Sequence, residues 1–153
     1  MKIRFARDKD YAAIARLHRQ TIRNVNSKDY PEDMILVWSS QTNAKKFRDN
    51  AKRCKRWVAV QDNKIVGFCD HNLDGEFWGL YVHKNYIGQG IGSRLLKNAE
   101  KSLQKGGKKK NVIRATITAK DFYKKQGYKV VKKAFHVREN KRLPIFIMSK
   151  KLL

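Results

Sequence analysis

The most informative segment of this chain reads Tyr81-Val82-His83-Lys84-Asn85-Tyr86-Ile87-Gly88-Gln89-Gly90-Ile91-Gly92-Ser93. Its three glycines occupy alternate positions between a predicted strand and a predicted helix. Glycine allows the backbone to adopt conformations that side chains forbid and to approach a ligand closely. The free amides at the start of a helix, together with the helix dipole, form an anion site that suits a phosphate group. The segment therefore predicts a phosphate-binding loop, to which Ser93 can add a hydroxyl donor.

The two common nucleotide-binding motifs fit this loop poorly. The phosphate loop of nucleotide hydrolases has Lys and then Ser or Thr after its last glycine, whereas Gly92 is followed here by Ser93 and Arg94. A dinucleotide fingerprint needs a third glycine where this chain has Ser93, and no clear acidic partner follows about 20 residues later. The third possibility is a loop that binds acyl-CoA.

Two segments resemble motifs of the GNAT superfamily of acyl-CoA-dependent N-acyltransferases. Residues 80–96 resemble its motif A, and residues 118–128 resemble its later helix, usually written Ala-x-x-Phe-Tyr-x-x-x-Gly-Phe. The two segments have the family's separation, and the resemblance extends over nearly the whole chain, most closely to a subgroup of small bacterial members. It implies an acetyl-CoA-dependent N-acetyltransferase in which a primary amine attacks the thioester directly.

The hydrophobic pattern predicts an α/β fold with a mixed sheet, in one domain over residues 1–153. The GNAT resemblance implies that this central sheet is mostly antiparallel and flanked by helices. The turn signal Asp62-Asn63-Lys64 predicts a hairpin between two strands. Asp8 or Asp10 can cap a first helix that runs to about residue 24, and Thr118 can cap a late helix that Gly127 ends. Further helices are predicted at 31–40, 43–55 and 90–104, and strands at 2–6, 57–61, 65–71, 77–83, 112–117, 129–137 and 144–149.

The resemblance implies which residues bind the cofactor. The pyrophosphate of acetyl-CoA would meet the backbone of the glycine-rich loop, and the pantetheine arm would pair with the preceding strand. The family commonly has Arg or Gln where this chain has Ile87, and Asn where it has Thr116, so the backbone amides carry most of the expected binding. The implied cofactor-binding residues are Leu80, Tyr81, Val82, Ile87, Gly88, Gln89, Gly90, Ile91, Gly92, Ser93, Thr116 and Tyr123.

Three residues are candidates for the chemistry of acyl transfer. The backbone amide of Leu80 would stabilise the oxyanion, as the resemblance implies. The phenol of Tyr123 would protonate the departing thiolate, unless it is only a core residue. Glu76 is the candidate general base, since burial beside Phe77 and Trp78 would favour proton uptake; alternatively it lies in a solvent-facing turn and a chain of water molecules accepts the proton.

The remaining features limit cofactors and location. Cys69 and His71 have no companions at zinc-site spacing, so no metal is expected. Two cysteines make no disulfide framework, and the N-terminus reads as a strand rather than a signal peptide, so the sequence predicts a cytoplasmic protein with reduced thiols. No run of residues has the length and apolar character of a membrane span.

The formal net charge of +23 raises an alternative function. Basic residues concentrate at 45–56, 105–110 and 132–142, and such clusters can bind phosphate backbones. The chain could therefore be a nucleic-acid-binding protein on a GNAT scaffold, non-catalytic or acylating an RNA-borne amine such as aminoacyl-tRNA; a lysine-rich solvated surface explains the charge equally well. In the family that this chain resembles, the first helices and their connecting loop select the acceptor, so Asn26, Tyr30, Glu32 and Trp38 are candidates for the acceptor pocket. Dimers are common in that family, so a homodimer is among the partners that the resemblance suggests. The sequence does not identify the acceptor amine.

Overall fold

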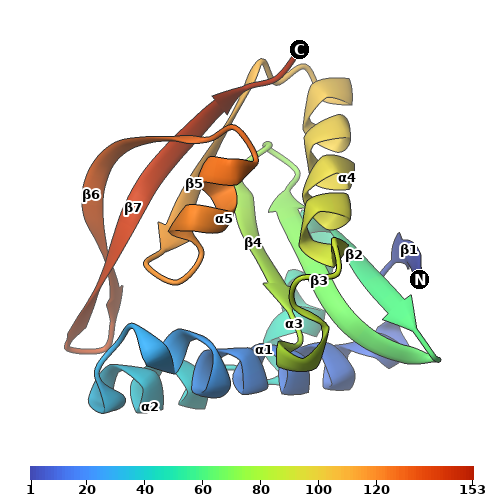
Figure 1. Ribbon diagram of the computed structural model, residues 1–153. Coiled ribbons are helices and arrows are strands. Elements are labelled where there is room, and N and C mark those ends of the chain that lie inside the picture. Colours follow the sequence, from blue (N-terminus) through green and yellow to red (C-terminus); the bar gives the residue numbers. More distant parts are fainter.

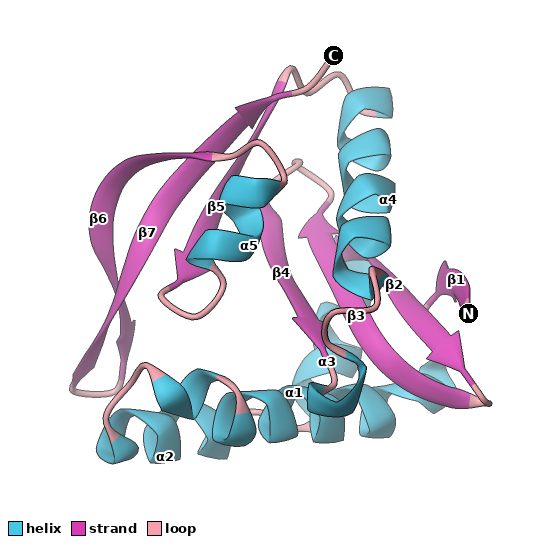
Figure 2. Cartoon of the chain, in the orientation of Figure 1, coloured by secondary structure: helices cyan, strands magenta, loops and turns pink.

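A computed structural model describes residues 1–153 as two antiparallel sheets with helices packed against them (Figures 1 and 2). The first sheet has the strand order β1-β2-β3-β4 and the second has the order β5-β7-β6. The strands are β1 (Lys2–Phe5), β2 (Cys54–Gln61), β3 (Lys64–Asn72), β4 (Phe77–Val82), β5 (Lys110–Thr116), β6 (Lys129–Arg138) and β7 (Lys141–Lys151). The helices are α1 (Tyr11–Asn24), α2 (Glu32–Ser40), α3 (Ala44–Asn50), α4 (Ile91–Lys105) and α5 (Lys120–Lys125).

The predicted α/β class and its mostly antiparallel strands are confirmed, with one refinement. Neighbouring strands β4 and β5 are joined by no ladder of hydrogen bonds, so the expected single sheet is divided between them. The two strands diverge in Figure 1, with α5 over one side of the gap and α1 and α2 at its lower end. Because sheets leave backbone groups unpaired at an edge, this division exposes the inner edge of β4 to a ligand.

The hairpin between β2 and β3 forms where the sequence predicts it. Asp62 and Asn63 both adopt positive φ, at 52° and 61°, which is the backbone of a two-residue turn whose twist matches that of the strands. The hairpin lies in the sheet that carries β4, so its register fixes the position of that strand.

Helix α4 packs on the first sheet and positions the glycine-rich loop. Its buried residues are spaced along one face and join a core with β3, β5 and β7. A Cβ atom added at Gly67 in β3 would lie 3.0 Å from Leu95 Cδ1 and 3.1 Å from the Tyr81 carbonyl oxygen, so this strand needs glycine for the close approach of α4. The face that α4 buries consists of Ile91, Leu95, Leu96, Ala99, Glu100 and Leu103.

Two predicted helix boundaries are wrong. The helix expected at 43–55 ends at Asn50, because Cys54 already pairs with Asn72 as the first residue of β2. The expected cap by Thr118 does not form. Helix α5 begins two residues later, and the Ala119 amide donates to Thr116 Oγ1 at 3.2 Å instead. None of the helices combines the length and the apolar character that crossing a bilayer requires.

Candidate active site

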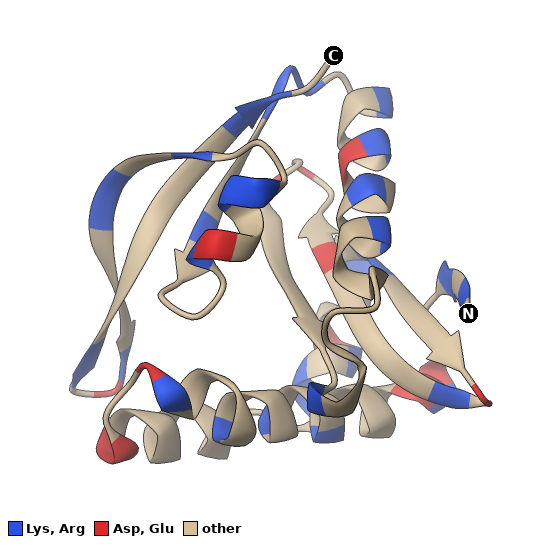
Figure 3. Ribbon diagram, in the orientation of Figure 1, with Lys and Arg blue, Asp and Glu red and all other residues tan.

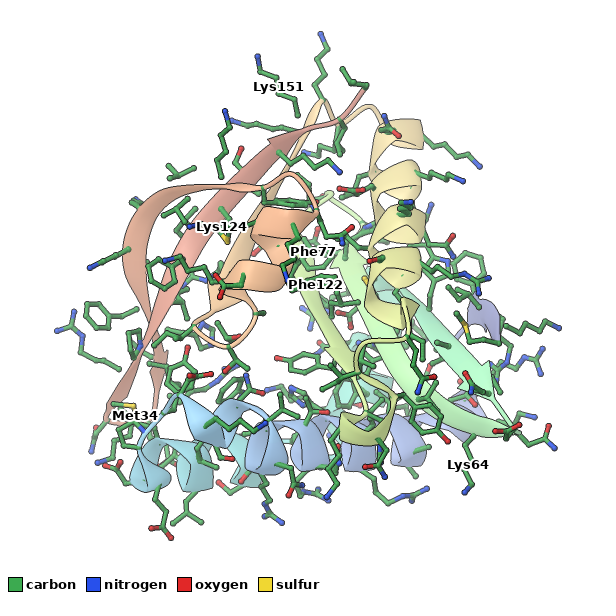
Figure 4. The ribbon with its side chains drawn as sticks, viewed as in Figure 1. Met34, Lys64, Phe77, Phe122, Lys124 and Lys151 are labelled. Atoms are coloured by element: carbon green, nitrogen blue, oxygen red, sulfur yellow. The ribbon has the colours of Figure 1, made fainter.

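The divergence of β4 and β5 opens a cleft of about 410 Å³. Its walls come from β4, the glycine-rich loop, the start of α4, the end of β5 and α5. Figure 4 shows Phe77 and Phe122, which reach this cleft from β4 and α5. All the predicted cofactor-binding residues line it except Gln89. The structure thus gathers residues 80–82, 86–88 and 90–93 with Thr116 and Tyr123 around one space.

The glycine-rich loop has the backbone of an anion-binding turn. Gly88 and Gly90 have φ values of 86° and 82°, in the left-handed region that favours glycine, and Gly90 directly precedes α4. A Cβ atom added at either glycine would find no atom within 4 Å, so the loop is open on the side where a ligand would approach. The first amides of α4 therefore face a space that can hold a phosphate group.

The other positions of the loop have structural roles. A Cβ atom at Gly92 would lie 3.2 Å from the ring of Phe122, so glycine there lets α5 pack against α4. Ser93 Oγ accepts a hydrogen bond from Gln126 Nε2 at 2.9 Å, which ties the loop to the end of α5. Ile87, where the family commonly has Arg or Gln, is 54% exposed and offers the cleft an apolar side chain.

The inner edge of β4 presents free amides. The His83 amide donates to the Val66 carbonyl of β3 at 2.8 Å. Because backbone groups alternate in direction along a strand, the amides of Leu80 and Val82 point away from β3, toward β5. No ladder joins β4 to β5, so these two amides remain available to a ligand.

Tyr123 lies at the base of this cleft. Its side chain is 4% exposed and packs edge-on against Phe77 and Tyr128, with ring centroids 6.4 and 5.6 Å away. The structure gives its hydroxyl no hydrogen-bond partner within the protein. Burial raises the pKa of Tyr123 well above that of a free phenol, so the group stays protonated at neutral pH. A buried, unbonded phenol in a cleft can donate a proton to a ligand.

A second cleft of about 450 Å³ lies on the α1 side of β4. The Leu80 and Val82 side chains pack with the core of α4, whereas Tyr81 packs with that of α1, so β4 separates the two spaces. The clefts meet between β4 and β5, where both are lined by Phe77, Trp78, Gly79, Tyr81, Arg114 and Thr116. Ligands on the two sides of β4 can therefore touch through this junction.

Glu76 lines the second cleft, and of its two alternatives the solvent-facing turn is confirmed and burial beside Phe77 and Trp78 is wrong. Glu76 is exposed because it precedes β4, at the end of a turn that begins at Asn72. Asn72 fixes the turn, since its Oδ1 accepts from the Glu76 amide at 2.7 Å and its Nδ2 donates to Glu76 Oε2 at 3.4 Å. The carboxylate is thus held at the rim of the cleft rather than in an apolar pocket.

The other acidic and histidine residues near β4 are either engaged elsewhere or outside the clefts. Asp70 is buried in an ion pair with Arg56, with 2.8 Å between Oδ2 and Nε. His71 contacts Ser102 Oγ and the Asn72 carbonyl on the α4 side of the sheet. Asp74 lines neither cleft. Asp70 and His71 are held by these contacts and Asp74 lies outside both clefts, which leaves Glu76 as the free carboxylate beside the second cleft.

Two histidines that showed no pattern in the sequence line the second cleft. Burial and the charges of Lys46 and Arg138 lower the pKa of His18 to about 3. Burial and the charges of Arg138 and Arg114 lower the pKa of His136 to about 4. Both imidazoles are therefore neutral and weakly basic at neutral pH. Of the residues expected in an acceptor pocket, Tyr30 and Trp38 line this cleft, Asn26 lines the first cleft, and Glu32 lines neither.

Comparison with known proteins agrees with this geometry. Residues 26–152 match the family model of the acetyltransferase (GNAT) domain. The chain belongs to the GNAT acetyltransferase family. It is accordingly an acetyl-CoA-dependent N-acetyltransferase, as the two sequence motifs imply.

Individual relatives are distant in sequence and close in fold. The chain is 26% identical over 135 residues to the uncharacterized N-acetyltransferase YafP of Escherichia coli (strain K12). This alignment covers 86% of this chain and 83% of YafP. A GCN5-related N-acetyltransferase from Rhodopseudomonas palustris superposes with a TM-score of 0.94 at 24% identity, covering 99% of this chain and 95% of that one. The PaiA N-acetyltransferase from Thermoplasma acidophilum, solved in complex with coenzyme A, has a TM-score of 0.79 at 23% identity, with 99% of both chains covered. These structures share the fold of this GNAT chain.

Proposed function

We propose that acetyl-CoA occupies the first cleft and that the acceptor amine enters through the second. In this arrangement the pyrophosphate meets the amides of residues 87–93, and the pantetheine arm lies along Leu80, Tyr81 and Val82 beside Thr116. The thioester carbonyl oxygen then accepts from the Leu80 amide. The meeting of the two clefts at the gap between β4 and β5 is the observation that supports this arrangement.

Three groups carry the reaction in this proposal. The neutral amine nitrogen attacks the thioester carbon, a C–N bond forms, and the oxyanion is stabilised by the Leu80 amide. Glu76 takes the proton that the nitrogen loses, directly or through water, because the two histidines of the second cleft are weak bases. The C–S bond breaks and the coenzyme A thiolate receives a proton from Tyr123. Glu76 then releases its proton to solvent and Tyr123 takes one from solvent, so charge and protons balance over the cycle.

Replacement of Glu76 with Gln tests the base. The amide keeps the size of the side chain and its contact with Asn72 but cannot accept a proton. We expect kcat/KM for the amine to fall by about 100-fold near neutral pH, with acetyl-CoA binding unchanged. The release of coenzyme A thiol during amine acetylation measures this effect.

Asp74→Asn is the matched control, because it removes one carboxylate from the same turn without altering either cleft. It should retain the wild-type rate. Equal activity of Glu76→Gln and wild type would show that water molecules alone carry the proton away.

The charge and the cysteines support two broader proposals. Figure 3 shows Lys and Arg on α1, α4, α5 and the β6–β7 hairpin, so a nucleic acid or another polyanion remains a candidate partner, as does an RNA-borne acceptor. Cys54 and Cys69 are both free thiols, which fits a cytoplasmic protein. We also propose that the 153 residues act as one domain. Sedimentation, which measures the molecular mass in solution, tests whether this domain forms a homodimer.

A further inference from the structure

The second cleft carries an excess of positive charge that the reaction described above does not use. Arg56 is neutralised by Asp70, but four other cations line this space without a carboxylate within 4.0 Å. These cations are Lys46 of α3, Arg53 before β2, Arg114 of β5 and Arg138 at the end of β6. Glu76 is the one unpaired carboxylate that faces them. The cleft thus has three more unpaired positive charges than negative ones.

Arg138 is the cation with the most unused binding capacity. It is the least exposed of the four, and its Nε is buried without a hydrogen-bond partner. Arg114 donates to the Phe135 carbonyl at 3.1 Å, and Arg53 donates to Asn50 Oδ1, so both are partly engaged. His136 lies nearby with its Nε2 also buried and unpartnered. Buried polar groups normally have partners, and the structure gives the Arg138 guanidinium none within the protein, so this lining residue is available to an anionic ligand.

We propose that the acceptor is a small primary amine that also carries a carboxylate or phosphate group, which Arg138 and Lys46 bind. This inference rests on the proposed function, because it assigns the second cleft to the acceptor. A guanidinium matches the planar geometry of both anions with paired hydrogen bonds. The volume of about 450 Å³ suits a small molecule rather than a protein surface.

The same charges act on the amine. Nearby cations disfavour an ammonium ion and so favour the neutral amine, which is the form that attacks the thioester. An acceptor with a single anionic group gains attraction from these charges, whereas a diamine or polyamine brings a second ammonium that they repel. The cleft should therefore select against polycationic acceptors as well as in favour of anionic ones.

Matched amines separate these effects. One pair is 4-aminobutanoate and butylamine, which have the same carbon chain and similar basicity; the other is 2-aminoethyl phosphate and ethanolamine. The dication 1,4-diaminobutane completes the set. Calorimetry measures binding to the protein with and without coenzyme A at about 0.15 M salt, and thiol release from acetyl-CoA measures kcat/KM. We expect the anionic member of a pair to bind more tightly and to react at least about tenfold faster.

Substitution of Arg138 with Gln should reduce the preference for the anionic amine over its matched partner by about 10- to 100-fold. Acetyl-CoA binding should be retained, which also shows that the variant is folded. Arg138→Lys should restore part of it. Arg16→Gln is the control, since Arg16 is exposed on α1, lines neither cleft and changes the net charge equally. Comparison of 4-aminobutanoate with 2-aminoethyl phosphate, in binding and in kcat/KM, identifies which anion the cleft prefers.

Two results would overturn the inference. One is equal or better binding and turnover of butylamine or 1,4-diaminobutane; the other is an anion preference that Arg138→Gln leaves unchanged. Binding of the anionic amines without any turnover would support the anion site and contradict the assignment of the second cleft to the acceptor, so the two failures are distinguishable.

Discussion

A valine at Gly90 should lower the affinity for acetyl-CoA by about 100-fold. Gly90 has a φ of 82°, which costs a β-branched residue about 1–3 kcal/mol, and its open side faces the first cleft. The substitution therefore both strains the loop and places a side chain where the pyrophosphate would lie. Calorimetric titration of the purified variant with acetyl-CoA measures the loss.

Gly107→Val separates the two causes. Gly107 has a φ of 88°, and an added Cβ atom would meet nothing within 4 Å, so its backbone strain matches that of Gly90. It lies beyond the end of α4 and lines neither cleft. Gly107→Val should lose similar thermal stability but bind acetyl-CoA like wild type. Comparable loss of binding in both variants would argue against a pyrophosphate site at Gly90.

Phenylalanine at Tyr123 should lower kcat by about 100-fold or more, because the thiolate would leave without a proton donor. The affinity for acetyl-CoA and the thermal stability should change little, since the Tyr123 hydroxyl has no hydrogen-bond partner in the protein. The raised pKa of Tyr123 keeps the wild-type phenol protonated as the pH rises, so its loss of a proton should not limit kcat in the neutral and mildly alkaline range. Steady-state rates across pH measure the fall in kcat and its pH dependence.

Tyr128→Phe is the matched control for a lost phenol. The Tyr128 hydroxyl donates to Glu100 Oε2 at 2.7 Å and accepts from Asn111 Nδ2 at 2.8 Å, both in the core. Its removal leaves the buried Asn111 Nδ2 without its partner, while Glu100 keeps its ion pair with Lys150, and should cost about 1–3 kcal/mol of stability while kcat changes only slightly. An unchanged kcat in Tyr123→Phe would assign Tyr123 to the core alone.

The glycine-rich loop of the first cleft could be predicted from the sequence because its requirements are local. A left-handed backbone at Gly88 and Gly90 leaves a direct mark on residue choice. The place of Tyr123 beside this loop was implied by the GNAT resemblance instead, since α4 and β5 lie between them in the chain. The hairpin at Asp62 and Asn63 was predictable for the same reason.

The second cleft could be predicted only in part: Tyr30, Trp38 and Glu76 line it as expected, whereas its cations and histidines meet only in the folded chain. His18, Lys46 and Arg138 come from α1, α3 and β6, and no spacing in the sequence brings them together. The helix predicted at 43–55 is too long for a similar reason. Cys54 pairs with Asn72 of β3, and this strand pairing between distant residues outweighs the helical spacing of the local sequence. The exposure of Glu76 depends on where the turn before β4 ends, which hydrophobic pattern alone does not fix.

The most direct test of the central claim is calorimetric titration of the wild-type protein with acetyl-CoA. Salt of about 0.5 M shortens the range of surface electrostatics and suppresses loose binding of an anion to a chain of +23 charge. Saturable binding of one acetyl-CoA per chain is the expected result, because the glycine-rich loop and the free edge of β4 form a single site. Binding that vanishes at this salt, or that never saturates, would contradict the assignment of the first cleft.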